Sequence, residues 1–164
     1  MTDEVLVALR SRAVRWVRGY RFEDFEVGQQ FKHHWGRTLT ESDNIVFTTL
    51  TLHYNPRYFN LDYARSEGHS NLVVCPLLVF TTTFGLSVED LSENGGPFLG
   101  VDDLSYYRPV KVGETIYAES EVLACRETKS RPEFGIVTWK TRGTTQSGEP
   151  LVQFQRSNLV RRRD

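Results

Sequence analysis

The chain has 164 residues, 39% of them hydrophobic and 25% charged, and its 20 Lys and Arg against 21 Asp and Glu give a formal net charge of −1. A chain of this length can form one domain whose core needs no disulfide or structural metal. Because neither sign of charge dominates, the composition gives no indication of a nucleic-acid partner and is typical of a globular protein in water.

The two cysteines and the N-terminal residues indicate a reducing compartment. Cys75 and Cys125 are too few for a disulfide scaffold, and nothing in their spacing suggests a zinc site. The N-terminus has no basic region, Arg10 interrupts its short apolar stretch, and no apolar run approaches the roughly 20 residues needed to cross a membrane. We therefore expect a cytoplasmic protein without a membrane partner.

Residues 1–20 are expected to form a peripheral amphipathic helix, separate from a main domain over residues 21–164. Apolar side chains recur among arginines in the first stretch at helical spacing, namely Val5, Leu9, Val14 and Val17. Residues 21–28 alternate apolar and acidic side chains and end at a glycine, which predicts a lead-in segment and a turn.

Two further helices are predicted in the first half of the main domain. Thr40 and Asp43 have the spacing of a capping box. The helix that they begin carries an apolar stripe of Ile45, Val46, Thr49, Leu50 and Leu52. Residues 72–86 are apolar almost all round, and their Val and Thr content favours a strand locally. The length of this stretch and Pro76 near its start instead predict a buried helix with the proline in its first turn.

From residue 98 onward the pattern predicts strands. Residues 116–122 and 136–142 alternate in hydrophobicity, and a hairpin turn at 146–149 precedes a strand over 151–160. Helices first and antiparallel strands later predict an α+β domain. The acidic pair Asp102 and Asp103 is expected on a strand surface, and the pair His33 and His34 is expected to be structural or exposed.

Three segments resemble a known family. Residues 52–64 read LHYNPRYFNLDYA, which is similar to the signature Asp-x-Asn-Pro-x-His-x-Asp-x-x-x-Ala of the MaoC-like (R)-specific enoyl-CoA hydratases. Residues 104–115 read LSYYRPVKVGET and resemble that family's strand and turn Phe/Tyr-x-Arg-Pro-Val-x-x-Gly-Asp-Thr. Residues 126–132 resemble members that handle short branched acyl-CoAs, such as mesaconyl-CoA hydratases.

The resemblance implies a single hot-dog fold, in which an antiparallel sheet wraps a long central helix. Such proteins usually form a homodimer, or an oligomer of dimers, with the acyl thioester at the dimer interface. The implied function is a hydratase or dehydratase of an enoyl or β-hydroxyacyl thioester, carried by CoA or a carrier protein, with no cofactor and no metal. Arg57 and Arg108 are local cations that could serve a CoA ligand.

The family's catalytic positions are substituted in this chain. In the family, an aspartate and a histidine hold the water that adds to the double bond, and these positions are His53 and Tyr58 here. A neutral imidazole can accept a proton, and a phenol can donate one or hydrogen-bond an enolate oxygen, so this pair could still perform acid–base chemistry. Asn55 matches the motif and could orient either partner, and Asn60 replaces its later aspartate.

The start of the buried helix is the second part of the site that the resemblance implies. The family's oxyanion glycine falls on Pro76, and proline has no N–H with which to polarise a thioester carbonyl. The donor would then be a neighbour such as Leu77, whose amide lies in the first helical turn. Cys75 is expected to be a small buried residue beside the substrate, and Phe80 and Phe84 are expected to form apolar walls of an acyl tunnel.

Two other readings remain open for the sequence. A hot-dog thioesterase, or an enzyme that adds another nucleophile to the enoyl thioester, would share the fold. Such thioesterases commonly need an acidic residue on the central helix, and residues 72–88 contain none. A non-catalytic partner subunit or acyl-binding module would also lack the family's aspartate, histidine and glycine together.

Overall fold

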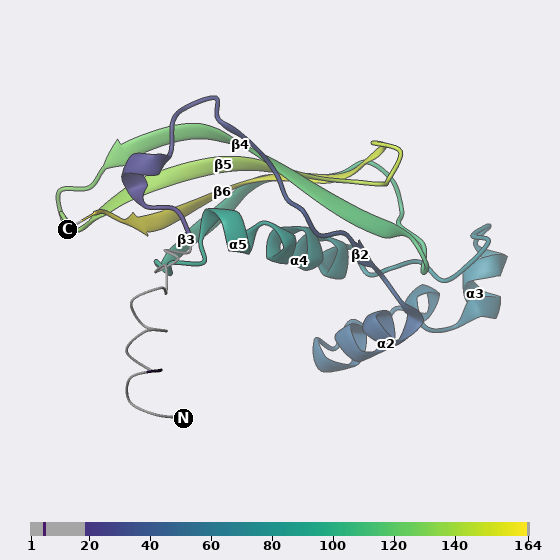
Figure 1. Ribbon diagram of the computed structural model, residues 1–164. Coiled ribbons are helices and arrows are strands. Elements are labelled where there is room, and N and C mark those ends of the chain that lie inside the picture. The colour runs from purple at the N-terminus through teal and green to yellow at the C-terminus, as the bar shows by residue number, and fades with distance from the viewer. Residues whose placement is uncertain (1–4, 6–18, 164) are drawn as a thin grey trace.

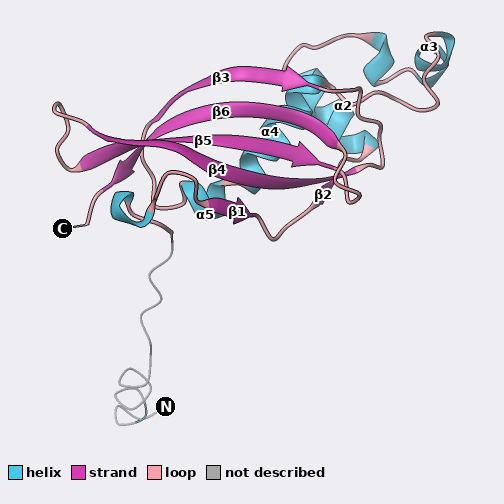
Figure 2. Ribbon diagram, turned by 90° about the horizontal axis from the view of Figure 1, so that it is seen from above, coloured by secondary structure: helices cyan, strands magenta, loops and turns pink. Residues whose placement is uncertain are grey.

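The computed structural model describes Val5 and residues 19–163, so the helix predicted over residues 1–20 falls almost wholly outside the described residues. In the described part, a six-stranded antiparallel sheet lies across a layer of helices (Figures 1 and 2). The strand order is β1-β4-β5-β6-β3, and the short β2 pairs with β4. This arrangement confirms the predicted α+β hot-dog architecture.

The strands are β1 (Gln30–Lys32), β2 (Arg37–Thr38), β3 (Phe98–Tyr106), β4 (Thr115–Glu127), β5 (Phe134–Thr144) and β6 (Pro150–Arg161). The helices are η1 (Phe22–Asp24), α2 (Glu41–Leu50), η2 (Pro56–Tyr58), α3 (Leu61–Ser66), α4 (Pro76–Leu86) and α5 (Val88–Leu91), where η marks a 3-10 helix. The predicted strands and hairpin are confirmed. Gly148 makes the turn before β6 possible because its φ is 82°, in the left-handed region that favours glycine.

The central helix is α4, and it begins at Pro76 rather than at residue 72. Proline occupies the first helical position, where no N–H is needed, and the residue before it is extended, as its ring requires. The preceding residues Val73 and Val74 instead pair with the 110–111 segment, Val74 donating its N–H to the carbonyl of Val110 at 2.8 Å. The sheet covers one side of α4, and Leu77 on another side is 39% exposed.

Two apolar clusters fill the space between the sheet and the helices. The first lies at the start of α4 and contains Leu39, Val74, Cys75, Leu78, Val79, Val110, Ile116, Leu151 and Val152. The second lies toward α5 and contains Phe25, Phe31, Leu91, Val122, Val137, Trp139 and Val160. The first cluster therefore supports the end of the molecule that carries α2, η2 and α3 (Figure 1).

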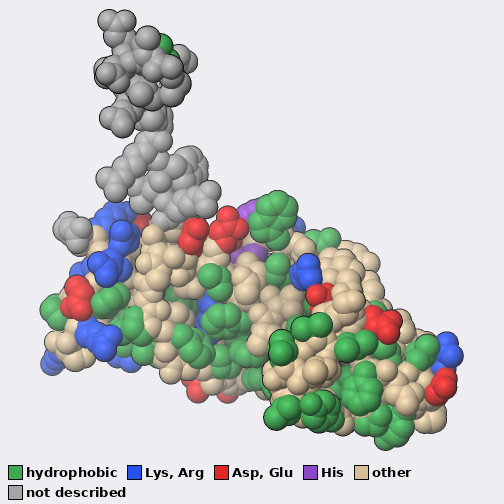
Figure 3. All heavy atoms as spheres, turned by 90° about the horizontal axis from the view of Figure 1, so that it is seen from below, with side chains coloured by type: hydrophobic (Ala, Val, Ile, Leu, Met, Phe, Trp, Pro, Cys, Tyr) green, Lys and Arg blue, Asp and Glu red, His purple; other side chains and the backbone are tan. Residues whose placement is uncertain are grey.

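Helix α2 has the predicted capping box but turns its apolar stripe outward. Thr40 accepts a hydrogen bond from the Asp43 amide, and the Asp43 carboxylate accepts one from the Thr40 amide. The buried residues of α2 are Asn44 and Thr48, whereas Val46 is 56% exposed. The apolar stripe therefore lies on the outer face of α2, because polar side chains occupy the inner face. Figure 3 shows apolar side chains gathered over this helix.

The described residues contain two free cysteines, no cluster of metal ligands and no membrane-spanning helix. Cys75 is buried, Cys125 is half-buried, and both are free thiols. No three His, Cys, Asp or Glu side chains of residues 19–163 are grouped as ligands of a metal ion. Within the same range, no helix is long and apolar enough to cross a membrane.

Candidate active site

A cavity of about 360 Å³ lies where η2, the start of α4 and the end of β3 meet. Its apolar lining consists of Val73, Val74, Pro76, Val79, Pro109 and Val110. Its polar lining consists of Arg57, Tyr58, Tyr106, Tyr107 and Arg108. A concave apolar space with a few converging polar groups is the usual form of a small-molecule site.

Tyr58 reaches this cavity from η2, and Asn55 holds the turn that carries it. The Asn55 side-chain oxygen accepts a hydrogen bond from the Arg57 amide at 3.2 Å, and its carbonyl accepts one from the Tyr58 amide at 3.0 Å. Tyr58 is half-buried and packs against the first apolar cluster. Asn55 thus acts on Tyr58 through the backbone of the turn.

Asn44 is a residue of the site region that no sequence motif indicated. It is fully buried on α2, and its side-chain oxygen accepts a hydrogen bond from the Cys75 amide at 2.9 Å. Its side-chain nitrogen donates to the carbonyls of Tyr58 at 2.7 Å and Val73 at 2.9 Å. One amide therefore ties α2 to η2 and to the start of α4. The available signal was a polar pair, Asn44 and Thr48, one turn apart in the predicted helix.

His53 lies on an exposed turn and is not part of the cavity lining. Its Nδ1 is 3.2 Å from the Thr51 hydroxyl, and its carbonyl accepts a hydrogen bond from the Asn55 amide at 2.8 Å. The turn is unusual because the backbone of Leu52 has a φ of 58°, a value that residues other than glycine rarely adopt. The structure thus brings Tyr58, but not His53, to the cavity, and their action as a pair remains a prediction.

The start of α4 supplies an apolar wall and one free amide. Cys75 is fully buried, as expected of a small core residue, and its side chain makes no capping bond. Pro76 lines the cavity. The Leu77 amide has no acceptor among the described residues, but Leu77 is absent from the lining. The predicted role of this amide as a thioester donor therefore remains untested.

Two of the predicted substrate-binding residues lie away from the cavity. The ring of Phe80 packs against Phe154 at 4.9 Å between centroids and against Phe84 at 6.0 Å, so it is not part of this cavity's lining, and its role in an acyl tunnel stays a prediction. The physical reason is that Phe80 follows Val79 on α4 and turns into an aromatic cluster under β6. Asn60 is exposed and caps α3, where its side-chain oxygen accepts from the Tyr63 amide at 3.1 Å.

Tyr106 enters the cavity from the end of β3, opposite the 3-10 helix that carries Tyr58. Burial raises the pKa of Tyr106 to about 12, with further contributions from Cys75 and Tyr58. Burial also raises the pKa of Tyr58, and Cys75 adds to that effect. Both phenols therefore stay protonated at neutral pH and act as hydrogen-bond donors.

The two arginines of the lining are already engaged in ion pairs. Arg108 contacts Glu114 at 2.6 Å and Glu149 at 2.9 Å, and its hydrogen bonds lower the pKa of Glu114. Arg57 contacts Glu67 at 3.1 Å. These pairs leave little net positive charge from either arginine at the cavity.

Comparison with known proteins identifies the family to which the chain is similar. The mesaconyl-CoA hydratase family model matches residues 2–164. The chain is 36% identical over 162 residues to mesaconyl-CoA hydratase of Haloarcula marismortui, covering 98% of this chain and 45% of that protein. It is 31% identical over 130 residues to the (R)-specific enoyl-CoA hydratase of Aeromonas caviae, covering 79% of this chain and 91% of that protein.

A solved structure agrees with these matches. The crystal structure of a MaoC domain protein dehydratase from Chloroflexus aurantiacus superposes with a TM-score of 0.85 at 31% identity, covering 93% of this chain and 43% of that one. The chain thus spans about half the length of the curated mesaconyl-CoA hydratases that it matches. With its sheet, its central helix and its match over residues 2–164, the chain belongs to the mesaconyl-CoA hydratase family of MaoC-like hot-dog proteins.

Proposed function

We propose that this chain is a hot-dog unit of a hydro-lyase that adds water to a short branched enoyl thioester or removes it from the β-hydroxyacyl form. The observation that carries the proposal is the cavity at the start of α4, where Tyr58 and Tyr106 lie among apolar side chains and two arginines that are paired with carboxylates. Membership in the mesaconyl-CoA hydratase family supports acyl-CoA as the substrate class. The chemistry requires no cofactor and no metal.

The proposed roles follow from the two substituted positions. The neutral imidazole of His53 takes the proton of the attacking water, and Tyr58 donates a hydrogen bond to the enolate oxygen. Because His53 is on the surface and Tyr58 is in the lining, substrate or a second hot-dog unit must close over the turn before the two act together.

We further propose that a second unit completes the site, in a homodimer or an oligomer of dimers. Among the described residues, β3 pairs with β6 on one side and with no strand on the other. Its free edge exposes Phe98, Leu99 and Leu104, and its last residue, Tyr106, lines the cavity. A partner strand along this edge would therefore border the acyl site. No nucleic acid or membrane partner is proposed, and the two free thiols are compatible with a cytoplasmic location.

A non-catalytic acyl-binding or partner subunit is the second candidate function. Pro76 favours it, because position 76 has no N–H with which to polarise a thioester. Hydrolysis of the thioester has less support. Helix α4 contains no Asp or Glu, and Asp90 on α5 is hydrogen-bonded to His33 instead of lining the cavity.

The test is hydration of crotonyl-CoA and mesaconyl-CoA by the purified protein, followed as loss of enoyl absorbance. We expect turnover by the wild type, with kcat lowered about 100-fold in Tyr58→Phe and in His53→Ala, the scale of a lost acid or base. His69→Ala, on the half-buried segment after α3, is the control for a histidine change outside this cavity's lining. Turnover that neither variant diminishes would refute the acid–base pair, and acyl-CoA binding without turnover would establish the non-catalytic function.

A further inference from the structure

The polar groups of the cavity divide into those that already have partners and those that do not. Arg57 and Arg108 are held by carboxylates, and the Tyr107 hydroxyl donates to the Gln153 side chain at 3.4 Å. The hydroxyls of Tyr58 and Tyr106 make no hydrogen bond with any described residue, and neither is sealed from solvent. Among the described lining residues, the side-chain donors without a partner therefore include these two phenols and the buried Nε of Arg57, and the phenols are the two hydroxyl groups among them.

Most backbone N–H groups around the cavity already have an acceptor and are not available to a ligand. Pro76 has no N–H, and the amides of Val73 and Val74 donate to the carbonyls of Arg57 at 3.2 Å and Val110 at 2.8 Å. The Val79 amide donates to the Cys75 carbonyl at 3.2 Å. The amide of Leu77 is free but lies outside the lining, so a ligand oxygen in this cavity must find its hydrogen bonds mainly among side chains.

Addition of water to an enoyl thioester places negative charge on one oxygen. The water oxygen bonds to the β-carbon as one of its O–H bonds breaks and that proton passes to the base, proposed here to be His53. The electron pair of the double bond moves toward the thioester carbonyl, and the α-carbon then takes a proton back from the protonated base, so that one H and one OH have been added. The enolate oxygen carries the charge between these events. Fixed donors directed at that oxygen lower the barrier, and one such donor is worth about 100-fold or more in kcat.

We propose that the Tyr106 hydroxyl is a catalytic hydrogen-bond donor to the thioester oxygen and that, together with Tyr58, it forms a phenolic oxyanion site in place of the amide that Pro76 lacks. Tyr106 reaches this point because β3 ends beside η2, which brings residues 58 and 106 to one cavity. The raised pKa of each phenol keeps its proton in place, which suits a donor and not a base. The inference rests on the proposed hydration.

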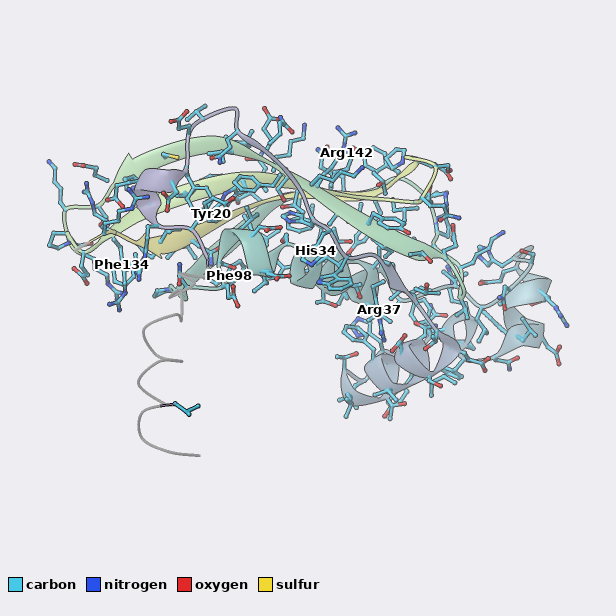
Figure 4. All side chains as sticks on the ribbon, viewed as in Figure 1. Tyr20, His34, Arg37, Phe98, Phe134 and Arg142 are labelled. Carbon is cyan, nitrogen blue, oxygen red and sulfur yellow. The ribbon has the colours of Figure 1, made fainter. Side chains whose placement is uncertain are left out.

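The experiment compares Tyr106→Phe with Tyr20→Phe, which makes the same chemical change at a residue with the same exposure. Tyr20 and Tyr106 are each 39% exposed, and Tyr20 lies at the end of the molecule opposite α2 and α3 (Figure 4). Two readouts are taken for each protein: kcat for crotonyl-CoA hydration, and the infrared carbonyl frequency of bound crotonyl-CoA. Hydrogen bonding lowers this frequency, so the second readout reports thioester polarisation without turnover.

We expect Tyr106→Phe to lower kcat about 100-fold and to shift the carbonyl band upward toward its value in free substrate. Tyr20→Phe should match the wild type in both readouts, and Tyr58→Phe should shift the band in the same direction as Tyr106→Phe. If Tyr106→Phe has the same carbonyl frequency and the same kcat as the wild type, the inference is overturned while the hydratase function stands. A wild type that neither binds nor hydrates acyl-CoA overturns the proposed function itself.

Discussion

At the scale of single residues, the side-chain amide of Asn44 holds the backbone of η2 and of the segment that leads into α4, which both border the cavity. Its three hydrogen bonds reach the backbone of Tyr58, Val73 and Cys75, all from a fully buried side chain. Each backbone group left without a partner in such a place costs about 1–3 kcal/mol. The position of the Tyr58 ring therefore depends on a side chain that does not line the cavity.

Replacing Asn44 by Ala is expected to lower the free energy of unfolding by about 3 kcal/mol or more, because three backbone groups lose their partner. Urea denaturation of the variant measures this loss. The matched control is Asn60→Ala, which removes an exposed helix cap and should cost only about 1 kcal/mol. Equal losses in the two variants would show that Asn44 is no more than a local cap.

His33 gives the stability of the protein a dependence on pH. It is buried, as predicted for a structural histidine, with Nδ1 2.5 Å from the Asp90 carboxylate and Nε2 2.9 Å from the Ser120 hydroxyl. Burial lowers the pKa of His33 and, with Arg156 and His34, outweighs Asp90, which raises it. Below its ordinary pKa of 6.5, the unfolded chain thus binds a proton that the folded chain does not yet bind.

The stability that His33 contributes should therefore be complete above pH 6.5 and decline as the pH falls through the folded-state pKa. His33→Gln, which hydrogen-bonds but does not titrate, should lose that part of the decline. Unfolding midpoints in urea at about pH 7.5 and about pH 5.5 measure the difference for both proteins. A variant with the same pH dependence as the wild type would assign the decline to other groups.

At the scale of elements, the feature that matters for assembly is the edge strand β3. It forms one edge of the sheet (Figure 2), and the pairing with β6 is interrupted by irregularities near Leu99 and Leu104. Asp102 and Asp103 are exposed on it, as predicted, and Asp103 accepts a hydrogen bond from Gln155 at 2.7 Å. An edge strand with exposed apolar side chains is a ready surface for pairing with another strand.

Lysines at positions 99 and 104 test that pairing. Leu99 is 48% exposed and Leu104 is 36% exposed, so the double change L99K and L104K leaves the core of one chain intact. We expect it to raise the dissociation constant of a dimer at least about 10-fold, because buried charges oppose strand pairing. Sedimentation velocity measures the mass, with Val27→Lys, a 67% exposed loop position, as the control. A wild-type monomer, or a dimer that the double variant preserves, would contradict the pairing.

The elements differ in how far the sequence could predict them. The long strands and α4 follow from local apolar periodicity and from Pro76, and both are confirmed. The inward face of α2 could not be read in this way, because Asn44 is buried by hydrogen bonds to residues 14 to 31 positions away. Hydrophobic patterning takes no account of a polar residue whose partners lie elsewhere in the chain.

The candidate site was predicted in part for a related reason. Motif spacing located Tyr58 and Pro76, which both line the cavity. It gave no indication of Tyr106, whose place depends on where β3 ends relative to η2. It also could not foresee that Leu52, with its φ of 58°, forms a turn that leaves His53 exposed.

At the scale of the whole molecule, the single chain presents a partly open site. The cavity lies at the end of the free strand β3, and the face of α2 beside it exposes several large apolar side chains (Figure 3). The relatives of about twice this length have room for two such units. These features agree with a hot-dog unit that works as a pair.

Whether the protein adds water to an enoyl thioester is decided by the product that it forms from mesaconyl-CoA in isotopically labelled water. Mass spectrometry would follow the acyl chain and the thioester separately. We expect the wild type to form a product with an intact thioester and one solvent oxygen in the acyl chain, and Tyr58→Phe to form much less of it. Release of free CoA, or an unchanged acyl chain under conditions where the protein binds the thioester, would contradict this expectation.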